Sequence, residues 1–163
     1  MGLLLKSLGS AMLAAVGIIV YRLYAAYLGR RIREYDSFLS LLSHIHKEIR
    51  LYLSPPSRLF FGYRDKLLDS LGFISRAASD GVGMAFSAVR RRLTMSSDGV
   101  KILAELFSGF GRDSREGELR RIDEAVSALS NIRSREAGEM EKSLKLCAAM
   151  ICAAVLGTII LLI

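Results

Sequence analysis

The C-terminal part of the chain is an uninterrupted apolar run. The last charged residue is Lys145, and the 18 residues from Leu146 to Ile163 carry no charge and are rich in Leu, Ile and Ala. A helix of about 18 or more apolar residues can cross the hydrocarbon core of a bilayer, which is roughly 30 Å thick. A helix of a soluble domain keeps a polar face, and this run has none. We therefore predict a transmembrane segment at residues 146–163, and a buried core helix is the less favoured alternative.

A second apolar stretch lies near the amino terminus, but it is shorter. Only 15 uncharged residues separate Lys6 from Arg22, so a span here needs flanking basic side chains to reach back to the interface. Three tyrosines at its end would lie at headgroup depth, where aromatic residues are enriched: Tyr21, Tyr24 and Tyr27. We predict a transmembrane segment within residues 1–28. The alternative is a cleaved signal peptide, although a good small-x-small cleavage site is lacking.

Almost all the charge lies between these two stretches. Residues 22–145 hold 22 of the 23 Lys and Arg residues and all 16 Asp and Glu residues, a net charge of +6. Basic residues close to a span favour the cytoplasmic side. Those on the inner flanks are Arg22, Arg30, Arg31, Arg33, Arg133, Arg135, Lys142 and Lys145. Because the outer side carries only Lys6 and the amino terminus, we predict a multi-pass protein of the cell membrane whose central domain, residues 29–145, is cytoplasmic.

The central domain shows helical periodicity. Apolar residues recur three or four positions apart on one stripe: Tyr35, Phe38, Leu39, Leu42, Ile45, Ile49 and Leu53. This stripe predicts one helix that runs from the first span to about Leu53, where Pro55-Pro56 ends it. A similar stripe from Leu119 to Leu144 predicts a last helix that continues into the second span. Asp113-x-x-Glu116, a relative of the capping box, would open that helix.

Shorter elements are expected between the two long helices. A helix from Pro56-Ser57 to about Ser70 would end at Gly72, a typical C-terminal cap. The segment 73–79 and an Asp80-Gly81 turn follow. Further helices are predicted at Val82–Leu93 and at Val100–Ser108, with N-cap candidates at Ser96-Ser97-Asp98. We predict an all-α fold, an antiparallel helical bundle on a two-helix transmembrane stem.

The residues that carry chemistry in enzymes are sparse. His44 and His46 stand two positions apart, so on a helix they point in different directions. Cys147 and Cys152 both lie in the second apolar stretch and on different helix faces, which disfavours a mutual disulfide or a shared metal. The Gly-x-Gly sequences lack the Gly-Lys-Ser/Thr of a phosphate-binding loop. We expect no catalytic, cofactor-binding or metal-binding residue and no enzyme activity.

Two features are candidate contact surfaces. The first is the basic cluster Arg90-Arg91-Arg92, which suits anionic lipid headgroups or an acidic partner, and suits equally a solvated helix end. The second is a stripe of small residues in the C-terminal segment, Ala149, Ala153 and Gly157. Small residues allow close helix approach in lipid, with a partner, with a second copy, or between the two spans of one chain. Nucleic acid is not expected as a partner, since 16 acidic residues dilute the positive charge and no base-reading motif is present.

Several groups of residues follow one another in a characteristic order. They are Lys6 and Gly9, Arg30-Arg31-x-Arg33, Leu41-Leu42-x-x-Ile45-x-x-Glu48-Ile49, Pro55-Pro56, Leu106-Phe107-x-x-Phe110-Gly111-x-Asp113, and the apolar end through Gly157 to Ile163. In this order and spacing the chain resembles the stage III sporulation protein AB family of endospore-forming bacteria over essentially its whole length. It departs from the family at Phe110, where Leu is frequent, and at Glu116 and Glu118, where Gln is frequent.

The resemblance implies a specific role. Members of the family belong to a multi-protein channel between the mother-cell and forespore membranes. Their soluble domain is similar to the cytoplasmic domains of platform proteins in type II secretion and type IV pilus machines. The resemblance therefore implies a platform in the mother-cell membrane facing the forespore. Its partners would be a secretion-type ATPase, other channel proteins and the lipid bilayer, and a homo-oligomer is compatible with it.

Two other functions remain open. One is a membrane-anchored adaptor that recruits a cytoplasmic partner. The other is a small pore-forming membrane protein, which would need polar residues facing a lumen. The two spans offer almost none beyond Ser10 and Thr158, which disfavours the pore.

Overall fold

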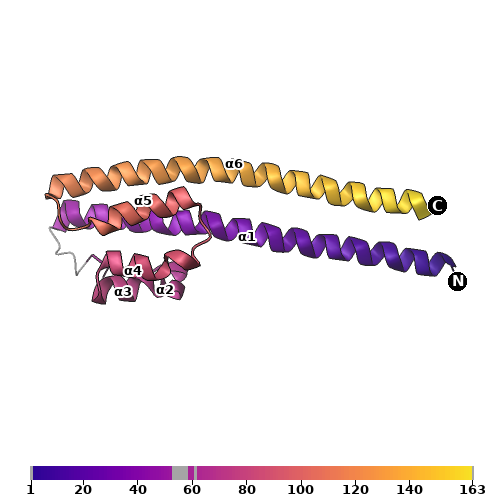
Figure 1. The fold of residues 1–163 in the computed structure, drawn as a ribbon, viewed down its shortest axis with the longest axis horizontal. Helices are drawn as coiled ribbons and strands as arrows, with labels where there is room; N and C mark the ends of the chain where they lie inside the picture. Colours follow the sequence, from indigo (N-terminus) through magenta and orange to yellow (C-terminus); the bar gives the residue numbers. More distant parts are fainter. Residues whose placement is uncertain (1, 53–58, 61, 163) are drawn as a thin grey trace. The chain divides into compact units, whose positions relative to one another are not determined.

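The computed structural model describes residues 2–52, 59–60 and 62–162, and in this part of the chain every regular element is a helix (Figure 1). Two units are distinguished along the chain. Unit 1 comprises residues 1–29 and 136–163, and unit 2 comprises residues 30–135. Two long helices contribute to both units, α1 (Gly2–Tyr52) and α6 (Arg115–Leu162). The predicted all-α fold is confirmed.

Unit 2 is built around antiparallel segments of α1 and α6. Arg133 binds Asp36 through two hydrogen bonds, from Nε to Oδ1 at 3.0 Å and from Nη2 to Oδ2 at 3.3 Å. At the other end of the pair, Arg115 donates from Nε to the carbonyl oxygen of Ile49 at 3.1 Å and from Nη2 to that of Arg50. Because residue numbers rise along one helix as they fall along the other, these contacts confirm the predicted antiparallel packing.

In the described part of unit 2, four shorter helices and one 3-10 turn accompany these two long helices. They are α2 (Lys66–Leu71), α3 (Phe73–Ser79), α4 (Val82–Val89), η2 (Arg90–Arg92) and α5 (Ser97–Ser108). A cluster of four phenylalanines joins α1, α3, α4 and α5: Phe38, Phe73, Phe86 and Phe107. In five of the six ring pairs the centroids lie 5.4–6.4 Å apart, which is the spacing of favourable aromatic pairs. All four rings are buried, so this cluster forms the centre of the core.

The predicted helix from Pro56 to about Ser70 is wrong at its start. The helix α2 begins at Lys66, because Asp65 acts as its N-cap and Oδ1 accepts from the backbone N–H groups of Leu67 and Leu68, both at 2.9 Å. Gly72 ends the helix as expected, with a φ of 72° that favours glycine. The predicted stop at Leu53 and Pro55-Pro56 lies outside the described residues.

The predicted helix at Val82–Leu93 is shorter than expected. It is α-helical to Val89, tightens into η2 at the three arginines, and is extended at Leu93. The next helix, predicted at Val100–Ser108, begins three residues earlier, at Ser97, and ends at Ser108 as predicted. Among the N-cap candidates Ser96 is the one used, since its Oγ accepts from the N–H of Gly99 at 3.4 Å.

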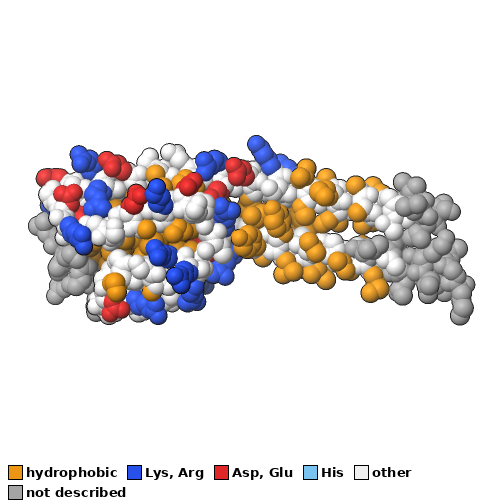
Figure 2. Space-filling model, in the orientation of Figure 1, with side chains coloured by type: hydrophobic (Ala, Val, Ile, Leu, Met, Phe, Trp, Pro, Cys, Tyr) orange, Lys and Arg blue, Asp and Glu red, His pale blue; other side chains and the backbone are white. Residues whose placement is uncertain are grey.

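Unit 1 contains the N-terminal part of α1 and the C-terminal part of α6. The two approach closely at Gly17, where a Cβ atom would lie 2.9 Å from Cγ2 of Ile151. Of the exposed large hydrophobic side chains that the structure describes, all but Leu51 and Met84 belong to unit 1, and Figure 2 shows hydrophobic side chains covering this part of the chain.

Among the described residues, none of the helices contains a stretch with both the length and the apolar character that crossing a bilayer requires. The two-span stem therefore stays a prediction.

Candidate functional site

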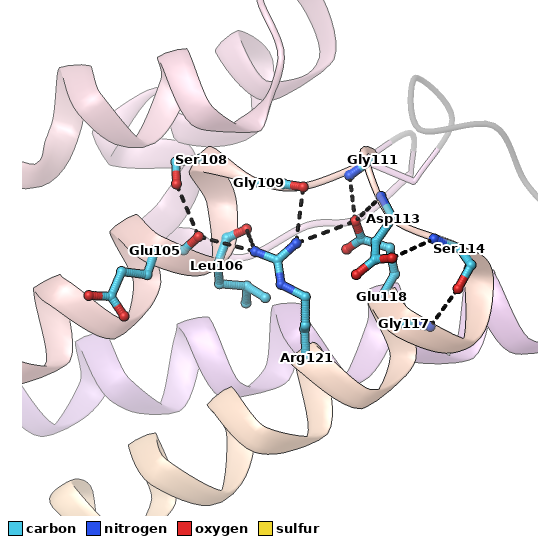
Figure 3. A network of polar contacts seen from close by, with 10 residues as sticks. All are labelled: Glu105, Leu106, Ser108, Gly109, Gly111, Asp113, Ser114, Gly117, Glu118 and Arg121. Atoms are coloured by element: carbon cyan, nitrogen blue, oxygen red, sulfur yellow. Dashed lines mark hydrogen bonds and ion pairs between the residues drawn. The ribbon is translucent and has the colours of Figure 1, made fainter.

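A network of polar contacts holds the turn between α5 and α6 (Figure 3). Its first centre is Arg121, which reaches from α6 to the end of α5. Its guanidinium donates to the carbonyl oxygens of Gly109 at 3.1 Å, Glu105 at 3.3 Å and Leu106 at 3.4 Å. The last carbonyls of a helix have no partner within that helix, and a cation there also suits the helix dipole. Arg121 therefore caps α5.

The second centre is Glu118, whose side chain is buried. Its Oε1 accepts from the backbone N–H of Gly111 at 2.9 Å and of Asp113 at 3.4 Å, and it lies 3.6 Å from Nη1 of Arg121. Gly111 has a φ of 81°, a conformation that glycine adopts without strain. Glu118 therefore binds the N–H groups that this turn exposes.

The predicted capping box of Asp113 and Glu116 is not what opens α6. Ser114 caps the helix instead, because its Oγ accepts from the N–H of Gly117 at 3.2 Å. Asp113 supports Ser114 by accepting its N–H at 2.9 Å. Glu116 is exposed, since it lies two residues before Glu118 and hence on a different side of the helix.

A second buried carboxylate holds the segment between η2 and α5. Glu34 on α1 is fully buried, and its Oε2 accepts from the N–H of Thr94 at 2.6 Å and of Met95 at 2.9 Å. Next to it, the hydroxyl of Tyr35 lies 2.8 Å from Oγ of Ser96 and accepts the N–H of that residue at 3.1 Å. The start of α5 is thus fastened to α1.

Sequence reasoning missed Glu34. A signal was available, because Glu34 stands four positions before Phe38 and so interrupts the apolar face of the helix with a charge. A carboxylate on a buried face needs hydrogen-bond donors, and here two backbone N–H groups and Nε of Arg30, at 3.3 Å, supply them.

Of the three arginines in the predicted basic cluster, only Arg92 lines a groove. Arg90, Arg91 and Arg92 are all exposed in η2. Arg92 also donates from Nη1 to the carbonyl oxygen of Leu71 at 3.5 Å, and with Arg30 it lines a groove on unit 2. Arg90 and Arg91 do not line that groove.

The predicted stripe of small residues lies on an exposed side of α6. Ala149, Ala153 and Gly157 are exposed, and a Cβ atom built at Gly157 would meet nothing within 4 Å among the described residues. The close approach within unit 1 uses Ile151 and Gly17 instead. The three small residues therefore remain candidates for contact with another chain.

The histidines and cysteines do not gather into a site. His44 stacks near Tyr63, with ring centroids 5.0 Å apart, and Nε2 of His46 lies 3.3 Å from Oδ1 of Asp123. Cys147 is half-buried and Cys152 is exposed, and both are free thiols. The described part of the chain holds no group of three or more His, Cys, Asp or Glu residues that could bind a metal ion.

Two side chains have shifted pKa values, and each shift has a local cause. Burial raises the pKa of Tyr63 above its usual value, and the charges of Asp65 and Asp69 raise it further, while a hydrogen bond with Ser40 opposes them. The hydrogen bond and charge of Lys145 lower the pKa of Glu141. Perturbed groups that gather in a cleft point to catalysis, whereas these two shifts have separate causes, burial at Tyr63 and contact with Lys145 at Glu141.

Comparison with known proteins identifies one family. A family model described as stage III sporulation protein AB matches residues 6–163, which is nearly the whole chain. Neither the curated proteins nor the solved structures contain a match.

Proposed function

Because this chain belongs to the stage III sporulation protein AB family, we propose that it is a non-enzymatic platform of the channel between mother cell and forespore. In this proposal two transmembrane segments anchor it in the mother-cell membrane. Its helical domain, in the cytoplasm, couples to a secretion-type ATPase. The observation that carries the proposal is that the family match includes both apolar ends as well as the helical domain.

Membrane anchoring is supported by the difference between the two units in exposed hydrophobic side chains. The described large hydrophobic side chains that face outward lie almost entirely in unit 1. Exposed apolar surface of this kind marks a lipid or protein contact. The uncharged sequence from Leu146 to Ile163 is long enough for a span, and its final residues extend past the part of the chain whose side chains are described.

A platform role is supported by how unit 2 uses its polar side chains. Glu34 and Arg121 join α1 and α6 to backbone groups of other elements, and Glu118 binds the turn before α6, so these hydrogen bonds maintain the fold of the domain. Helices α1 and α6 are each continuous over about 50 residues. In this proposal the two helices connect, along the chain, the domain that couples to the ATPase with the anchoring segments.

The proposal is tested by purification of the full-length, tagged protein in detergent from sporulating cells. We expect the ATPase and other channel proteins to co-purify with it. We also expect deletion of the gene to stop forespore development after engulfment and to abolish heat-resistant spores. Normal spore counts in the deletion strain would contradict the proposal. Recovery of a different cytoplasmic protein without the ATPase would favour the adaptor.

A further inference from the structure

A groove of about 960 Å³ lies on unit 2 where the first turns of its α1 segment face α2 and η2. Five of the residues that line it are cationic: Arg30, Arg33, Arg64, Lys66 and Arg92. They come from three segments that are distant in sequence, around residues 30–33, 64–66 and 92, so only the fold gathers them. In Figure 2, Lys and Arg side chains are prominent over the part of unit 2 formed by α2 to α4.

The acidic residues of the groove are engaged elsewhere. Asp36 binds Arg133, which does not line the groove, through both of its carboxylate oxygens. Asp65 accepts two backbone N–H groups as the N-cap of α2. The charge of Asp36 is therefore balanced by a cation outside the groove, whereas Asp65 keeps its charge, so five cations face one unbalanced carboxylate among the residues that line the groove.

The cations of the groove are partly free and partly held in place. Arg33, Arg64 and Lys66 are exposed and have no ion-pair partner among the residues that the structure describes. Arg92 is held by its hydrogen bond to Leu71. The backbone that follows Arg92 is fixed by buried Glu34. The groove thus presents several cations on a framework that is already ordered.

The place of the groove in the sequence indicates its ligand. Arg30 and Arg33 belong to the same continuous helix as the predicted span of residues 1–28 and follow it within about one turn or two. Basic residues at such a position lie at the level of the lipid headgroups.

We propose that this groove binds the phosphate group of an anionic phospholipid from the membrane in which the chain is anchored. Guanidinium groups bind phosphate oxygens in a planar, two-pronged geometry, and Lys66 adds a further charge. The inference rests on the proposed membrane anchoring. A soluble acidic protein would also be attracted by the charge, but it would not need the groove to begin directly after a span.

The experiment uses the full-length protein in a neutral detergent, titrated with short-chain phosphatidylglycerol and, separately, with short-chain phosphatidylcholine. We expect phosphatidylglycerol to bind more tightly and its affinity to fall with added salt. The double variant R64Q/K66Q should weaken phosphatidylglycerol binding roughly tenfold, since each basic residue near a membrane surface contributes several-fold. Both residues are exposed, and circular dichroism checks that the variant is folded.

The matched control is R90Q/R91Q. It removes the same charge from exposed positions one and two residues before Arg92, and neither position lines the groove. This control should bind phosphatidylglycerol within about twofold of the wild type. Equal losses in both double variants would overturn the inference, because they would show a general charge effect.

Two further titrations distinguish phosphatidylglycerol from other anionic ligands. Inorganic phosphate that binds as tightly as phosphatidylglycerol would overturn the inference in favour of a soluble anion site. Displacement of phosphatidylglycerol by a glutamate-rich peptide, at a peptide concentration below that of the lipid, would overturn it in favour of an acidic protein partner.

The need for detergent separates a failure of this inference from a failure of the anchoring. If wild-type protein needs detergent but shows no preference for phosphatidylglycerol, the inference fails and the anchoring stands. If the protein is freely soluble without detergent, the anchoring itself fails.

Discussion

Two buried glutamates organise the loops of unit 2 at the scale of single residues. Glu34 binds the N–H groups of Thr94 and Met95, and Glu118 binds those of Gly111 and Asp113. In both cases one carboxylate satisfies two backbone donors that the loop cannot satisfy itself. A backbone N–H that loses its acceptor costs free energy, so each glutamate stabilises the conformation of its loop.

Replacement of Glu118 by Ala should destabilise the domain. The change leaves the N–H groups of Gly111 and Asp113 without their acceptor and removes the carboxylate beside Arg121, so we expect a loss of about 1–3 kcal/mol in unfolding free energy. Glu116→Ala is the matched control in the same first turn. Because Glu116 is exposed, its loss should cost less than about 0.5 kcal/mol. Thermal and denaturant unfolding followed by circular dichroism measures both, and equal losses would contradict the network.

The sequence predicted residues that follow a helical period of apolar positions, and it failed for residues whose role depends on the backbone conformation of a turn. The stripe on α1 correctly identified Tyr35, Phe38, Leu42 and Ile45 as core residues. The choice of Glu116 over Glu118 was wrong because a capping box assumes a standard entry into the helix. The left-handed turn at Gly111 changes which side chain faces the free N–H groups.

At the scale of elements, the long helices were predicted more reliably than the bounds of the short ones. The two long stripes determine α1 and α6 because many residues must agree on one face. The six residues of α2 offer too few positions for a period, and its start depends on a single cap, Asp65. The basic groove was not foreseen either, since its cations come from three separate segments. Arg30 and Arg33 had been considered only as flanking charges, and Arg92 only as part of the arginine cluster.

The pairing of helices in unit 1 depends on the small size of Gly17. A side chain there would overlap Ile151, since even a Cβ atom would lie at 2.9 Å, and overpacking of this kind costs about 1–3 kcal/mol. We expect Gly17→Leu to separate the two helices. The measurement is disulfide formation in membranes between a cysteine at Val20 and native Cys147, which line the same cavity, with Cys152 replaced by Ala.

The control for this experiment is Gly9→Leu in the same helix. A Cβ atom at Gly9 meets nothing within 4 Å among the described residues, so cross-linking should proceed as in the parent. Gly17→Leu should slow cross-linking several-fold. If the two leucine variants behaved alike, close approach at Gly17 would not be what holds the pair together.

At the scale of the whole molecule, charge and hydrophobicity are separated along the chain. Between residues 22 and 145 the chain carries nearly all its charge, while the described apolar side chains that face outward lie toward the two ends. The family match extends across both regions. A platform needs this division, because one part must remain in lipid while the other presents polar surface to its partners.

The proposed orientation, with the helical domain in the cytoplasm, rests on the basic residues that flank the two apolar ends, and it is open to direct measurement. In a background with Cys147 and Cys152 replaced by Ala, a cysteine at Ser79 should resist a membrane-impermeant maleimide in intact cells and react after permeabilisation. Ser79 is exposed on unit 2, so burial would not explain the protection. A cysteine at Gly2, on the side that carries few basic residues, should react in intact cells. Labelling of Ser79→Cys in intact cells would place the helical domain across the membrane from any cytoplasmic ATPase, and coupling to that motor would be impossible.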